Sequence, residues 1–118
     1  MLGSIEYAVE YLNTPLILVL GHESCGAVTA AFHSSGKAEG NIEAVIRPIM
    51  PAVKKAKDTM KGKKPEDQVD AAIDSNIDFM ARDMIVRSPI IKDHFNKEKL
   101  KIVKGKYHLR NGEVTIIR

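Results

Sequence analysis

Several residue types that mark common protein classes are scarce in this sequence. The 118 residues contain one cysteine and no tryptophan, and aromatic residues make up 5%. A single cysteine excludes an internal disulfide and is typical of a reducing compartment, so we expect a cytoplasmic protein. No apolar run approaches the ~18 residues that a transmembrane helix needs, and the first residues lack the basic start of a secretory signal. We therefore expect no membrane association.

The net charge excludes little, because it is only +3. Lysines gather in residues 54–64 and 92–106, but acidic residues are interleaved with them. Basic patches can bind nucleic acid, yet this chain has few aromatic rings on which bases could stack. The lysine-rich stretches are therefore interpreted as solvated helix faces, and nucleic acid is not an expected partner.

The first third of the chain predicts a helix followed by a buried strand. Apolar residues at helical spacing begin after Ser4, which can cap the helix, and Asn13-Thr14-Pro15 ends it. Residues 16–20, "LILVL", form a short unbroken apolar run. Such a run between helices is typical of a strand covered on both faces in a parallel sheet.

The remainder predicts more helices and a final hairpin, all in one domain spanning residues 1–118. The predicted helices are "AVTAAF", a segment from Asn41 divided by Pro48 and Pro51, residues 51–61, a long helix from Pro65, and one begun by Ser88 and Pro89. "LKIVKGKYHL" and "EVTII" predict two strands joined by an Asn-Gly turn. The fold class is thus α/β, with a central parallel strand flanked by helices and a C-terminal antiparallel hairpin. The strand at 16–20 requires neighbours on both sides, and this sequence offers one.

The most informative motif is "GHESCG", residues 21–26, directly after the apolar run. His22 and Cys25 are spaced so that both could bind one Zn²⁺, and Cys25 begins the next helix, where the helix dipole favours an anionic ligand. Gly21 and Gly26 would allow a sharp turn and close packing. An ordinary strand-to-helix turn and a Cys–His nucleophilic pair remain alternatives, whereas the glycine spacing does not match a phosphate-binding loop.

Two stretches resemble the β-class carbonic anhydrases. "GSIEYAVEYLNTPLILVLGHESCGAVTAA" resembles that family's helix and strand ending in G-H-x-x-C-G, and "SPIIKDHFNKEKLKIVKGKYHLRNGEVTII" resembles its closing helix and hairpin. The resemblance implies a reduced β-carbonic-anhydrase-like fold in which His22 and Cys25 match two of the family's three zinc ligands. It also implies reversible hydration of CO₂ to bicarbonate.

The sequence departs from the family pattern at the first ligand. That ligand is a cysteine in a C-x-D-S-R segment, whose Asp and Arg orient the zinc-bound water, and nothing here matches it. Strand 16–20 would then have a bare edge, which we expect a second copy of the chain to cover. Zinc could be shared between subunits. Glu23 is an adjacent carboxylate, while His33, His94 and His108 lie outside any ligand motif.

Two functions follow from this interpretation. The chain could be a zinc-dependent carbonate dehydratase, a lyase acting on CO₂ and bicarbonate, with the missing ligand supplied from elsewhere. Alternatively, it could be an inactive relative, a homo-oligomer that is metal-free or stapled by a structural His₂Cys₂ zinc site from two copies of the loop.

Overall fold

Helices and strands follow one another in the order that the sequence predicts. A computed structural model describes residues 1–117. The elements are α1 (Leu2–Tyr11), β1 (Leu16–His22), α2 (Gly26–His33), α3 (Ile42–Ile46), the 3₁₀ helix η1 (Arg47–Ile49), α4 (Met50–Thr59), α5 (Pro65–Arg87), α6 (Pro89–Asn96), β2 (Lys101–Tyr107) and β3 (Val114–Ile117). The α/β class is confirmed. None of these helices is long and apolar enough to cross a membrane.

The sheet has the strand order β1-β2-β3. β1 and β2 are parallel, in register from Leu16 opposite Lys101 to His22 opposite Tyr107. β2 and β3 form the predicted antiparallel hairpin. β2 therefore lies in the middle and β1 lies at the edge, with one hydrogen-bonded neighbour within residues 1–117.

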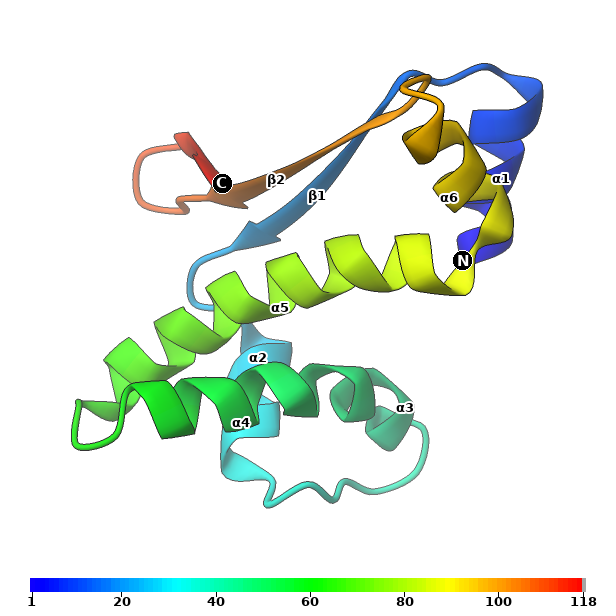
Figure 1. Cartoon of the computed structure of the whole chain (residues 1–118). Helices are drawn as coiled ribbons and strands as arrows, with labels where there is room; N and C mark the ends of the chain where they lie inside the picture. The colour runs from blue at the N-terminus through cyan, green and yellow to red at the C-terminus, as the bar shows by residue number, and fades with distance from the viewer. Residues whose placement is uncertain (118) are drawn as a thin grey trace.

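The long helix α5 organises the core. Figure 1 shows it running beneath the sheet, with α4 on its other side and α1 and α6 together near the start of β1. One apolar cluster joins α5 to α2, η1 and α4 and includes Val28, Val53 and Ile73. A second includes Val9, Ile91 and Met84, and Ile17 and Ile102 of the sheet pack against it. One helix thus supports both ends of β1.

The two faces of the sheet differ in cover. Alternate residues of a strand point to opposite faces. The covered face, which lies against α5, consists of Ile17, Val19, Gly21, Ile102, Lys104 and Lys106. The open face consists of Leu16, Leu18, Leu20, Val103, Val114 and Ile116, of which the three leucines are 49–51% exposed. Cover on both faces, as the sequence predicted, is not provided within residues 1–117.

Pro and Ser mark helix starts as predicted. Pro65 opens α5, and the helix of the middle segment ends at Ile46 before Pro48 and resumes as α4. Ser88 caps α6, since its hydroxyl accepts the Ile91 N–H at 3.1 Å. Asn41 precedes α3 as predicted, but its side chain makes no capping bond.

Several boundaries differ from the prediction, among them the end of β1, which runs to His22 and not to residue 20. α1 begins at Leu2 with Met1 as N-cap, not after Ser4, because Leu2 and Ile5 both pack on the second cluster. The hairpin strands are shorter than predicted and are joined by more than a two-residue Asn-Gly turn. His108 N–H donates to the Glu113 carbonyl at 2.8 Å, which leaves residues 109–112 as a four-residue loop.

Candidate metal centre

His22 is the last residue of β1 and lies on the open-face side of the sheet. It is exposed, and its Nδ1 lies 2.9 Å from the Glu23 carbonyl oxygen. In the tautomer in which Nδ1–H donates to that carbonyl, Nε2 carries the lone pair. Metal-bound histidines use this arrangement, in which a carbonyl fixes the ring while the other nitrogen binds the ion. The His22 ring thus fits a ligand role.

Cys25 stands at the N-cap of α2, half-buried and free. Its side chain makes no capping bond, so the sulfur is not engaged by the helix. Its backbone is held instead, because the carbonyl accepts both the Thr29 N–H at 3.0 Å and the Thr29 hydroxyl at 2.8 Å. A thiol and an imidazole are donors that Zn²⁺ prefers, so the pair fits that ion chemically.

One role was predicted for both Gly21 and Gly26, but the structure distinguishes them. A Cβ on Gly21 would lie 2.5 Å from Ile77 Cδ1, so α5 packs directly on the backbone of β1. Close packing at Gly21 is confirmed. Gly26 opens α2 at an ordinary φ, and a Cβ placed on it would have no neighbour within 4 Å among residues 1–117. The expectation that Gly26 serves close packing or a sharp turn is wrong. The left-handed residue is Ser24, at φ 53°.

Glu23 and His108 form a contact that the sequence did not indicate. The Glu23 carboxylate accepts the Arg110 backbone N–H at 3.0 Å and lies 3.4 Å from His108 Nδ1. The bond from Arg110 N–H, assisted by His108, lowers the pKa of the Glu23 carboxyl from its usual value. Glu23 therefore faces the hairpin. The partners are 85 and 87 residues away, so no local motif could have revealed them.

A third ligand is missing from the described residues. Within residues 1–117, no three His, Cys, Asp or Glu side chains are grouped so that they could hold a metal ion. His94 bonds to Glu10 at 2.8 Å between α6 and α1, and His108 bonds to Thr115 at 2.8 Å. Two donors are fewer than the three protein ligands of a typical catalytic zinc site. His22 and Cys25 therefore do not form such a site by themselves within residues 1–117.

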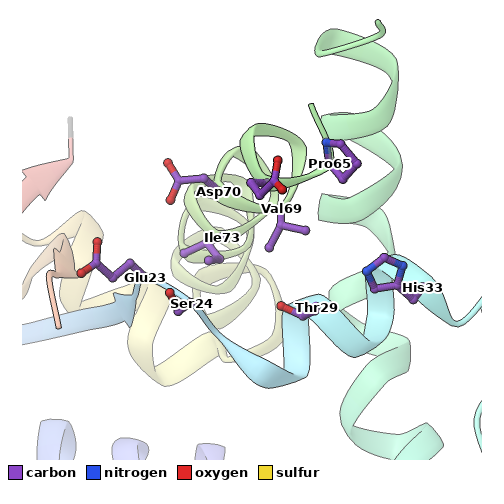
Figure 2. A pocket seen from close by; sticks show the side chains of 9 residues that line it. Glu23, Ser24, Thr29, His33, Pro65, Val69, Asp70 and Ile73 are labelled. Atoms are coloured by element: carbon purple, nitrogen blue, oxygen red, sulfur yellow. The ribbon is translucent and has the colours of Figure 1, made fainter. Parts of the chain in front are cut away.

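A cleft of about 580 Å³ lies beside the loop on the α5 side. Figure 2 shows Glu23 and Ser24 at one end of it and His33 and Pro65 at the other. Glu66 and Asp70 add further carboxylates to its wall. His22 and Cys25 do not line this cleft, so it is separate from the candidate ligands.

The family is shown by sequence comparison. The family model described as carbonic anhydrase matches residues 1–114. The chain belongs to the carbonic anhydrase family. It is 32% identical to a carbonic anhydrase of Mycolicibacterium smegmatis and 33% identical to carbonic anhydrase 2 of Mycobacterium tuberculosis, over 98% of its own length.

Solved structures show that the fold is that of the β-class. The chain matches the Coccomyxa β-carbonic anhydrase, solved in complex with acetazolamide, with a TM-score of 0.87 and 24% identity. It matches CafA of Aspergillus fumigatus with a TM-score of 0.86 and 17% identity. In both matches 98% of this chain is covered, but only 52% and 54% of the other. The chain likewise spans about half the length of the curated relatives, 55%.

Proposed function

We propose that this chain supplies His22 and Cys25 as two ligands of a zinc ion that hydrates CO₂ reversibly to bicarbonate. The observation that carries the proposal is the loop itself. An exposed imidazole, with Nδ1 held by a carbonyl at 2.9 Å, and an uncapped thiol flank a two-residue turn at the carboxyl end of β1. Membership of the carbonic anhydrase family supports this interpretation.

Gly21, His22 and Cys25 each have a distinct task in this proposal. His22 presents Nε2 and Cys25 presents its sulfur, while Gly21 holds the end of β1 against Ile77 of α5. When bound, zinc would supply the Lewis acidity that brings the pKa of water to ~7, so that hydroxide is available at neutral pH. The chain's own contribution is to hold and orient the two donors.

The remaining ligand must come from outside the described residues, and a second polypeptide chain is one source. β1 has hydrogen-bonding groups on its free edge, and the open face beside it is apolar. Unpaired edges and large apolar patches are features of surfaces that pair with other chains. We propose a homo-oligomer, at least a dimer, in a reducing cytoplasm. Such oligomers occur among the structural neighbours, since two β-carbonic anhydrases of Sordaria macrospora are tetrameric.

A second candidate function is a structural zinc site. Two copies of the loop would supply His₂Cys₂, and four protein ligands leave no position for water. The absence of a third donor near His22 and Cys25 within residues 1–117 favours this alternative over an active site built by one chain.

The test measures zinc content, assembly mass and the rate of CO₂ hydration on the same purified preparation. An active site predicts one zinc per chain and hydration above the uncatalysed rate. A structural staple predicts about one zinc per two chains without hydration. A folded protein that binds no zinc would contradict both.

A further inference from the structure

Glu23 ties the loop that carries His22 and Cys25 to the far end of the chain. In the sequence Glu23 lies between the two candidate ligands, and in the structure it is bonded to the hairpin, residues 101–117. Its N–H donates to the Tyr107 carbonyl at 3.1 Å, and one carboxylate oxygen accepts the Arg110 N–H at 3.0 Å. The backbone and the side chain of one residue are thus both bonded to the hairpin.

The second carboxylate oxygen faces His108. His108 Nδ1 lies 3.4 Å from Glu23 Oε2, and Nε2 lies 2.8 Å from the Thr115 hydroxyl on β3. Both the Glu23 and His108 side chains are 21% exposed, so solvent reaches them only in part. The imidazole therefore bridges the carboxylate to the second strand of the hairpin.

The turn between the ligands needs external support. Ser24 holds φ 53°, a left-handed conformation that residues with a Cβ adopt at some cost in free energy. A two-residue turn with one strained member would relax if nothing fixed its other member. Glu23 is that other member, and its bonds to Tyr107 and Arg110 fix it to the hairpin.

We propose that Glu23, oriented by His108, is a positioning residue that sets the geometry of the His22–Cys25 pair. The role of the pair as zinc ligands rests on the function proposed above, whereas the immobilisation of the loop does not. Residues that orient metal ligands typically change metal affinity about 10–100-fold when they are removed.

The experiment compares Glu23→Ala and Glu23→Gln with a matched control, Glu66→Ala. Glu66 lines the same cleft, but within residues 1–117 its side chain makes no bond to the loop or the hairpin. Two quantities are measured: amide hydrogen exchange at positions 23 and 110, whose N–H groups form the two bonds between the loop and the hairpin, in metal-free protein, and Zn²⁺ affinity by chelator competition. The Gln side chain keeps an oxygen for the Arg110 N–H, so it serves as the conservative rescue.

We expect Glu23→Ala to speed exchange at these amides at least ~10-fold and to weaken Zn²⁺ binding ~10-fold or more. Glu23→Gln should recover part of both, and Glu66→Ala should match the wild type. Exchange and affinity within twofold of the wild type in Glu23→Ala, in a protein that binds zinc, would overturn the positioning role alone. Faster loop exchange in a protein that binds no zinc would support the immobilising role and overturn the proposed function.

Discussion

The two faces of the sheet are built from different chemistry. On the covered face, Lys104 forms an ion pair with Asp78 at 2.6 Å, and Lys106 forms ion pairs with Asp70 at 2.5 Å and Asp74 at 3.0 Å. Every carboxylate in these pairs comes from α5, at intervals of four residues. The open face has apolar side chains over its centre, and residues 1–117 place no helix over them (Figure 1).

The difference shows which face of the sheet is covered within residues 1–117 and which is not. Buried charges persist only when they are paired, and α5 supplies a partner for each lysine of the covered face. Soluble proteins rarely leave several adjacent leucines, valines and isoleucines half-exposed. Leu16, Leu18 and Leu20 are therefore interpreted as a contact surface, and they lead directly to His22. His22 ends the strand that carries these leucines, and Cys25 follows it at the start of α2.

Two adjacent residues of β1 point to opposite faces of the sheet, and truncating each to alanine should give the largest difference in stability. Ile17 is partly buried against the second cluster, so Ile17→Ala should lower the free energy of unfolding by about 2–3 kcal/mol. Leu18 is 49% exposed, so Leu18→Ala should cost about 1 kcal/mol or less in dilute solution. Urea unfolding at two protein concentrations measures both values. Equal losses at low concentration would contradict the distinction between the faces.

Replacing one glycine on each face of the sheet with alanine should give the next largest difference in stability. Gly21→Ala forces its Cβ against buried Ile77, and overpacking of this kind costs about 1–3 kcal/mol. The added Cβ would also lie 2.6 Å from Ile77 Cγ1, so the double variant uses Ile77→Ala, which lacks both carbons. The double variant should lose less stability than the sum of the two single losses. Gly105→Ala meets Val114, Leu20 and Leu18 at 3.2–3.4 Å on the open face, where these side chains can move aside. Its cost should stay below about 1 kcal/mol, measured by the same unfolding assay.

Acid should weaken the covered face through Asp78. The Lys104 ammonium bonded to it lowers the pKa of the Asp78 carboxyl below its usual 3.8. Because the folded pKa is depressed, this contribution to stability is present above the unfolded pKa and is lost as the pH falls through the folded one. Asp78→Asn should cost about 1 kcal/mol at pH 7, and the cost should shrink below pH 3.8.

Asp93→Asn is the control for that pH series. Asp93 pairs with Lys97 on the surface, with side chains 56% and 59% exposed. Exposed pairs contribute little, so its loss should change the unfolding free energy by no more than about 0.5 kcal/mol. A cost of Asp78→Asn that did not vary between pH 7 and pH 3 would contradict the assigned ion pair.

Local signals predicted most of the fold. Pro65 and Ser88-Pro89 set helix starts by backbone geometry that a few neighbouring residues determine. The run at 16–20 predicted a strand with too few neighbours, and β1 is at the edge of the sheet. The helix start predicted after Ser4 is wrong because Leu2 packs on the second cluster, which extends α1 past a good capping residue. The two-residue Asn-Gly turn is wrong because the bond between His108 and Glu113 closes a longer loop.

The candidate site was predictable only in its contiguous part. His22 and Cys25 are close in sequence, so a motif could identify them, although their ligand role remains a proposal. The Glu23–His108 contact joins the two ends of the chain, and only the parallel pairing of β1 with β2 brings them together. Close packing at Gly21 was predicted, but the need for it depends on where Ile77 of α5 lies.

The most direct test of the account is native mass spectrometry of the wild type and Cys25→Ser, because it reads zinc content and assembly mass together. We predict a zinc-bound oligomer for the wild type and loss of the zinc in Cys25→Ser. Unchanged zinc content in Cys25→Ser, or a zinc-free monomer for the wild type, would contradict the assignment of His22 and Cys25 as zinc ligands beside the open face of the sheet.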